Sequence, residues 1–99
     1  MKAKDQAREW LDERCGRHAH IETYLVNASA APSVHEGRIT KPEEAASLPD
    51  LYEVGLVSYN LADLPDDLEV EIEDEPAERL QMVFDDGASV LIKVLITVT

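Results

Sequence analysis

The spacing of apolar residues predicts a helix at the start of the chain. Small and apolar residues recur at every fourth position from residue 3 to residue 15, with Trp10 beside them, and polar side chains fill the other face. Gly16 stands where a glycine commonly ends a helix. We therefore expect a helix over residues 3–16, with Trp10 and Cys15 on its buried side.

After Gly16 the pattern changes to the period of two that is typical of β-strands. It predicts a strand over residues 21–26 and a strand or a hairpin over residues 34–40. Residues 52–61 (YEVGLVSYNL) are apolar on both faces around a glycine, which indicates one inner or bulged strand. Residues 68–73 alternate strictly between apolar residues and glutamates, as in a half-buried antiparallel strand.

The last two strands are expected to form a hairpin around Gly87. A three-residue loop pairs Met82 with Val90 and gives one wholly apolar face, whereas a two-residue loop mixes the faces. In that register residues 94–98 extend beyond their partner. They would then require another strand of this chain, or a second chain.

These elements together predict an α+β fold in a single domain, residues 1–99. An N-terminal helix packs on a mainly antiparallel sheet of about four to six strands. Capping-box spacing at Thr40-Lys41-Pro42-Glu43 adds one short helix near residues 42–47. The start of the chain lacks the apolar stretch of a secretory signal, and Cys15 is the only cysteine, so we expect a cytoplasmic setting.

Charge adds a strong asymmetry to this picture. The chain has 9 Lys and Arg against 21 Asp and Glu, a net charge of −12. Residues 1–49 contain 7 basic and 8 acidic side chains, whereas residues 50–99 contain 2 and 13. Such an excess of acid argues against nucleic acid or an anionic membrane as a direct partner. Crowding within residues 63–78 is expected to raise the pKa values of the carboxylates there.

The strand over residues 68–73 would place its three glutamates on one face, about 6.7 Å apart. That spacing gives about half the linear charge density of a DNA strand, and neighbouring acids could supply the rest. A row of fixed carboxylates can displace nucleic acid from a basic groove, although a solvated face that discourages strand pairing has the same composition. The candidate partner-binding residues are Asp66, Asp67, Glu69, Glu71, Glu73, Asp74, Glu75, Asp85 and Asp86.

A strongly acidic domain of this size is similar in composition to small inhibitor proteins. Bacterial toxin-neutralising immunity proteins, phage-encoded DNA mimics and CRISPR inhibitors share this general character. The similarity implies a non-enzymatic protein that covers a basic surface, nucleic-acid-binding or catalytic, of another protein. The alternative is a subunit of an assembly or of a homo-oligomer, such as a homodimer, that pairs through the C-terminal strand.

A third hypothesis is a small enzyme or metal-binding protein that uses Cys15, His18 and His20, whose spacing could suit a metal. The four glycines are dispersed and form no phosphate-binding loop, and the serines lie in no nucleophile elbow. We therefore expect no enzymatic activity, and no catalytic residue, metal or cofactor.

Overall fold

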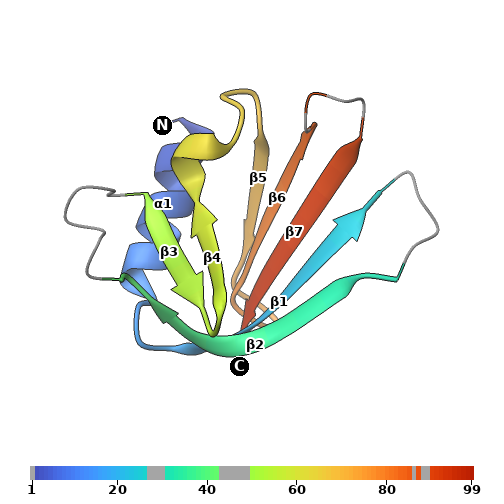
Figure 1. Ribbon diagram of the computed structural model, residues 1–99. Helices are drawn as coiled ribbons and strands as arrows, with labels where there is room; N and C mark the ends of the chain where they lie inside the picture. The colour runs from blue at the N-terminus through green and yellow to red at the C-terminus, as the bar shows by residue number, and fades with distance from the viewer. Residues whose placement is uncertain (1, 27–30, 43–49, 86, 88–89) are drawn as a thin grey trace.

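The computed structural model describes residues 2–26, 31–42, 50–85, 87 and 90–99. Within them the chain forms a helix followed by strands, with one short 3-10 turn (Figure 1). The elements in chain order are α1 (Ala3–Glu13), β1 (His18–Leu25), β2 (Ser33–Thr40), β3 (Leu51–Val54), β4 (Val57–Asn60), η2 (Leu61–Asp63), β5 (Glu69–Glu73), β6 (Arg79–Asp85) and β7 (Leu91–Val98).

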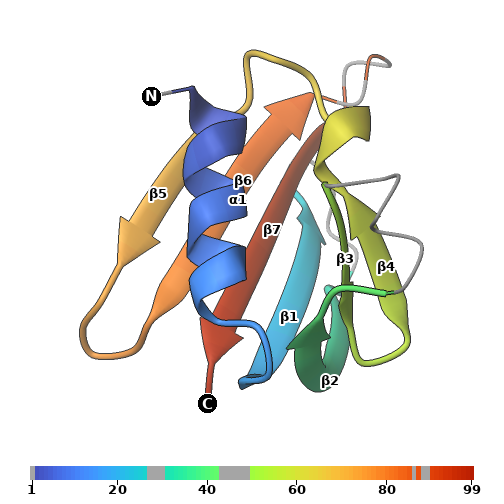
Figure 2. The ribbon, with the colours of Figure 1, turned by 90° about the vertical axis from the view of Figure 1, so that its left-hand side faces the viewer.

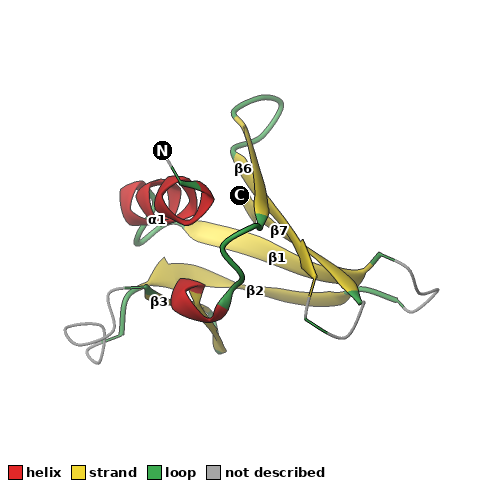
Figure 3. Cartoon of the chain, turned by 90° about the horizontal axis from the view of Figure 1, so that it is seen from above, coloured by secondary structure: helices red, strands yellow, loops and turns green. Residues whose placement is uncertain are grey.

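The strands form one curled sheet of seven strands in the order β4-β3-β2-β1-β7-β6-β5, and every neighbouring pair is antiparallel. The sheet curves into a half-barrel, and α1 lies on its concave side (Figures 2 and 3). The predicted α+β class, with an N-terminal helix on an antiparallel sheet, is confirmed. The number of strands is larger than the four to six expected.

The core lies between α1 and the concave face of the sheet. Trp10 is 3% exposed, which confirms its prediction as a core residue. Buried residues alternate along β1, β3, β6 and β7, as the period of two requires. The buried residues are Ala7, Trp10, Leu11, Ala19, Ile21, Ile39, Tyr52, Val54, Leu61, Leu68, Leu80, Met82, Val94, Ile96 and Val98.

The expected single strand over residues 52–61 is wrong, because this segment forms the β3–β4 hairpin. The chain reverses at Gly55, whose φ of +62° lies in the left-handed region that glycine adopts without strain. Leu56 follows in the turn with its side chain fully exposed. An apolar residue in this turn concealed the reversal, since the sequence there lacks the polar residues of most turns.

The last two strands do form the predicted hairpin, but the predicted register is wrong. Met82 pairs with Val94, not with Val90, because the connection between β6 and β7 spans five residues and not three. The shift is four residues, an even number, so the same side chains still face the core. The apolar face was therefore predicted correctly although the loop was not.

Strand β7 is central in the sheet. Its residues pair with β6 on one side and with β1 on the other, from Ala19↔Val98 to Leu25↔Ile92. The partner that the end of this strand requires is thus a strand of the same chain. The alternative hypothesis of a homo-oligomer that pairs through the C-terminal strand required an unpaired edge on β7, and both edges of β7 are paired within the chain.

Two helix predictions also need correction. Helix α1 ends at Glu13, and residues 14–16 form a turn in which Cys15 is exposed, contrary to its expected burial. The short helix expected near residues 42–47 falls mostly on residues 43–49, outside the described ranges. The turn η2, which the pattern did not predict, begins after Asn60, whose side-chain oxygen accepts a hydrogen bond from the Ala62 amide at 3.1 Å.

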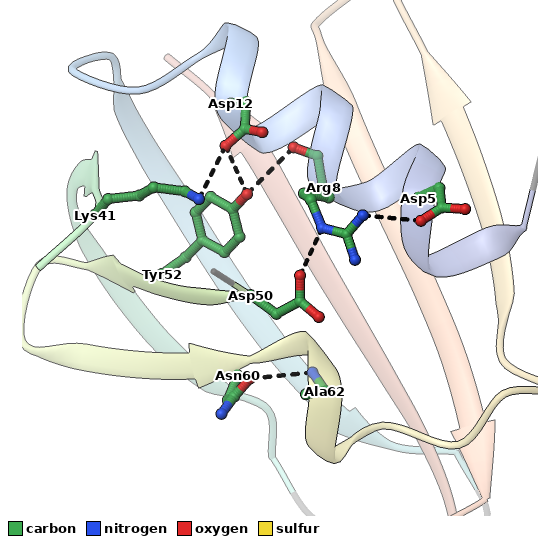
Figure 4. Close-up of polar contacts among 8 residues, drawn as sticks. All are labelled: Asp5, Arg8, Asp12, Lys41, Asp50, Tyr52, Asn60 and Ala62. Atoms are coloured by element: carbon green, nitrogen blue, oxygen red, sulfur yellow. Dashed lines mark hydrogen bonds and ion pairs between the residues drawn. The ribbon is translucent and has the colours of Figure 1, made fainter. Parts of the chain in front are cut away.

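Polar contacts attach α1 to the β3 region (Figure 4). The Tyr52 hydroxyl donates to the Asp12 carboxylate at 2.6 Å, and Arg8 Nε donates to Asp50 at 2.5 Å. Arg8 also pairs with Asp5 at 2.8 Å, one turn earlier on the helix. These contacts fix the helix along the open side of the half-barrel. No helix among the described residues has the length and apolar character to cross a membrane.

Candidate functional site

The predicted glutamate row lies on β5, at one edge of the sheet. Glu69, Glu71 and Glu73 are all exposed, and they alternate with Val70 and Ile72. Val70 packs against the core, so the three glutamates project from the opposite, convex face. Strand β5 pairs with β6 alone among the described strands, so its outer side has no strand partner there.

Strand β6 supplies few charges to balance this row. Glu73 lies opposite Arg79, with 3.8 Å between a carboxylate oxygen and Arg79 Nη1, and Glu71 accepts a 3.4 Å hydrogen bond from Gln81. Glu69 lies opposite Val83 and makes no ion pair within the described ranges. The row therefore has one arginine in reach, at its C-terminal end.

The loop before β5 and the end of β6 extend the acidic surface. Asp67, Glu69 and Asp85 line a hollow of about 250 Å³, whose apolar residues include Phe84. The Asp85 carboxylate also accepts a 2.8 Å hydrogen bond from the Gly87 amide. The structure thus brings together three of the predicted carboxylates, Asp67, Glu69 and Asp85, near the start of β5.

The remaining candidates are less uniform. Asp66 is exposed and lies 3.3 Å from Lys4 Nζ at the start of α1. Asp74 and Glu75 are exposed in the loop after β5, while Asp86 lies outside the described residues. We use the name acidic edge for the following eight residues: Asp66, Asp67, Glu69, Glu71, Glu73, Asp74, Glu75 and Asp85.

A groove of about 230 Å³ between α1 and β5 was not predicted. Trp10 and Ile72 line it together with the acids Glu9, Glu13 and Asp74, and its other lining residues are Gln6 and Arg14. Glu9 and Glu13 are one helical turn apart, so the sequence does place them on one face of α1. It does not reveal that this face lies beside β5, which is a tertiary contact.

Arg14 is the cation of this groove, and it is already engaged. It lies over the Trp10 ring at 4.4 Å, and its Nη2 is 3.3 Å from Glu78. Arg17 Nη2 is 2.7 Å from the other Glu78 oxygen, and this hydrogen bond is the main reason that the pKa of Glu78 lies below its usual range. The expectation that crowding raises the pKa values of the 63–78 carboxylates is therefore wrong for Glu78.

Cys15, His18 and His20 do not form a common site. His18 Nδ1 is 2.7 Å from Thr99 Oγ1, and His20 lies between Glu22 and Glu36, at 3.1 and 3.4 Å. Desolvation, together with the charge of Asp12, raises the pKa of the exposed Cys15 thiol, which lowers its thiolate fraction. No group of three or more His, Cys, Asp or Glu side chains in the described ranges is arranged to hold a metal ion.

No protein-family model, curated protein or solved structure matches this chain significantly. No residue role can therefore be transferred from a relative. The functional argument depends on the geometry and charge of the acidic edge.

Proposed function

We propose that this chain is a non-enzymatic binding protein whose acidic edge covers a basic surface of another protein. An inhibitor that occludes a nucleic-acid-binding or catalytic surface is the function that this arrangement supports best. The observation that carries the proposal is the exposed row Glu69, Glu71 and Glu73 on a sheet edge, where Arg79 is the one arginine paired to it in the described part of the chain.

The geometry suits such a role because the backbone fixes the carboxylates in space. Alternate residues of a strand are about 6.7 Å apart, so the row repeats at twice the 3.4 Å charge spacing of a DNA strand. Asp67 and Asp85 add charge at one end, and Asp74 and Glu75 at the other. A basic groove would therefore meet an extended array of negative charge.

The same surface predicts how binding would depend on salt. Most of these carboxylates are exposed, so their attraction to a basic partner is screened within about 8 Å at physiological ionic strength. Complementary charge mainly accelerates association, and it also disfavours acidic competitors. The proposed complex should form quickly and weaken as salt is added.

Affinity capture from a host-cell lysate, with washes at stepped salt and identification of the retained proteins, tests the proposal. The baits are the wild type, Glu69→Gln/Glu71→Gln on the acidic edge, and Glu36→Gln/Glu53→Gln on β2 and β3. The two variants lose equal charge, so the second controls for net charge alone. The retained protein is then produced, and its own nucleic-acid binding or catalysis is assayed with each bait added.

We expect one basic protein to be retained by the wild type and by the control variant and to be released at high salt. Its activity should fall when either of these two proteins is added, and remain when Glu69→Gln/Glu71→Gln is added. Equal retention and equal inhibition by all three baits would contradict the proposal. So would a retained protein whose surface is acidic.

A further inference from the structure

We propose that the partner supplies a β-strand that pairs with the free side of β5, and that this strand alternates basic and apolar side chains. This inference depends on the proposed function and specifies the form of the partner. The observations behind it are an unpaired strand edge, a row of carboxylates on one face of that strand, and on the other face a groove in which Trp10 and Ile72 lie among acidic residues.

The outer side of β5 is available for pairing. The strand has five residues without proline or glycine, and it pairs with β6 alone among the described strands. It forms the margin of the sheet beside α1 (Figure 2). Such an edge presents backbone N–H and C=O groups to which an extended peptide can add.

The two faces of β5 then determine the side chains of the added strand. Cross-strand neighbours lie on the same face, so one set of partner residues would lie beside Glu69, Glu71 and Glu73. Lysine or arginine at those positions would meet carboxylates. The alternate set would lie beside Val70 and Ile72, where apolar side chains would be favoured.

The groove between α1 and β5 gives the second set a place to bind. Ile72 is 45% exposed at its margin, although its side chain is on the α1 side of the sheet. Trp10 is 3% exposed and its indole N–H has no acceptor in the described part of the chain. A partner side chain in the groove would cover Ile72, whereas the indole N–H is buried within the protein and lies out of the partner's reach.

Charge identifies the occupant as a basic segment and not a second copy of β5. Pairing of two β5 edges would place glutamates of one copy beside glutamates of the other, and like charges across a strand pair are destabilising. The groove side carries Glu9, Glu13 and Asp74 as well. A strand with lysine or arginine on one face removes this repulsion.

Three synthetic peptides test the inference on the intact protein. The first alternates lysine and valine, the second has the same composition with all lysines before all valines, and the third is the first with N-methyl groups on alternate backbone amides. The N-methyl peptide keeps its charges but cannot pair as a strand on that side. Affinity is measured by titration, and the protection of the β5 amides by NMR-detected hydrogen exchange.

We expect the alternating peptide to bind about tenfold more tightly than either control, and to slow exchange of the outward-facing β5 amides. Equal affinity of all three peptides, with unchanged exchange, would overturn strand addition while leaving the electrostatic function intact. Binding by none of them, even at low salt, would overturn the proposed function together with this inference.

A pair of variants tests the groove separately. Ile72→Ala should weaken the alternating peptide by about fivefold to tenfold, because it removes the apolar contact beside the added strand. Leu56→Ala, at the fully exposed β3–β4 turn far along the sheet order, should leave the affinity unchanged. Equal affinity of the Ile72→Ala variant and the wild type, at unchanged thermal stability, would overturn the groove contact.

Discussion

The Tyr52 side chain joins the helix to the sheet. It is 1% exposed, and its hydroxyl donates to Asp12 at 2.6 Å, with the Arg8 carbonyl oxygen at 3.4 Å. Lys41 Nζ lies 4.7 Å from the ring centroid. Burial and the hydrogen bond to Asp12 raise the pKa of Tyr52 far above its ordinary value. The neutral hydroxyl is thus part of the folded structure.

Replacement of Tyr52 by Phe should lower the free energy of unfolding by about 1–2 kcal/mol, because a hydrogen bond to a carboxylate is lost while the ring stays buried. Because the pKa of Tyr52 is higher in the folded than in the unfolded protein, the neutral hydroxyl stabilises the folded state at pH values below the unfolded pKa near 10. This stabilisation is lost as the pH rises from that value toward the folded pKa. Urea unfolding at pH 7 and pH 11 should therefore show a smaller alkaline loss in Tyr52→Phe than in the wild type.

Tyr59→Phe is the matched control, since its hydroxyl makes only a 3.5 Å contact with Thr23 Oγ1. It should cost less stability at pH 7 than Tyr52→Phe. Equal losses in the two variants would show that the contact with Asp12 adds nothing.

Glu78 provides a second prediction at the scale of single residues. Its lowered folded pKa stabilises the protein above the unfolded value near 4.3, and this stability disappears as the pH falls through the folded pKa. Glu78→Gln should therefore melt at a lower temperature than the wild type at pH 7. The difference should shrink as the pH falls and the wild-type carboxylate becomes protonated.

Glu75→Gln is the corresponding control, because Glu75 is exposed and makes no ion pair in the described ranges. Calorimetric scans of the three proteins across this pH range make the comparison. A difference for Glu78→Gln that is as large at low pH as at pH 7 would exclude the pairing with Arg17 as its cause.

At the scale of elements, one close backbone contact sets how tightly the β3–β4 turn lies against β2. A Cβ atom at Gly37 on β2 would lie 2.2 Å from the Gly55 Cα atom in the β3–β4 turn. Strand β2 pairs with β1 through residues 33–38 and with β3 through Ile39 and Thr40, so Gly37 lies where β2 changes partner. Glycine at 37 allows the hairpin to fold close against β2.

Gly37→Ala should lower the free energy of unfolding by about 3 kcal/mol, because backbone atoms would have to move apart. Gly87→Ala is the control, since its φ is +92° but nothing lies within 4 Å of the added Cβ. It should cost about 1 kcal/mol from backbone strain alone. Chemical unfolding measures both, and equal losses would show that the contact at Gly37 is not limiting.

The faces of the strands could be predicted from sequence because burial imposes a period of two, whatever the pairing. Loop lengths and strand counts could not, because they depend on turns and on tertiary pairing. An apolar residue, Leu56, occupies the β3–β4 turn, so the turn could not be recognised from polar residues. In the β6–β7 hairpin, any shift of the strand register by an even number of residues leaves the same side chains buried, so the pattern could not select the register. The second partner of β7 lies near the opposite end of the chain, where local patterns carry no information about it.

At the scale of the whole molecule, charge is the dominant property. A net charge of −12 on 99 residues implies self-repulsion, which destabilises the compact state and is screened by salt. The melting temperature at pH 8 should therefore rise between about 10 mM and 300 mM sodium chloride, where the Debye length falls several-fold. A constant or falling melting temperature would show that ion pairs such as Arg8–Asp50 outweigh the repulsion.

The candidate site was predicted in part. Acid content and alternation placed Glu69, Glu71 and Glu73 on one exposed face, as the structure shows. The sequence could not show that β5 is an edge strand, because sheet order is a long-range property. For the same reason the sequence could not show that a groove lined by Trp10 and Ile72 lies beside β5.

The most direct test of the central claim is the salt dependence of the affinity for the captured partner. The wild type and the control Glu36→Gln/Glu53→Gln should lose affinity steeply as salt rises, with nearly parallel slopes. Glu69→Gln/Glu71→Gln should bind about tenfold more weakly at low salt and show a shallower slope. Equal weakening of both variants, or of neither, would contradict a binding role for the acidic edge.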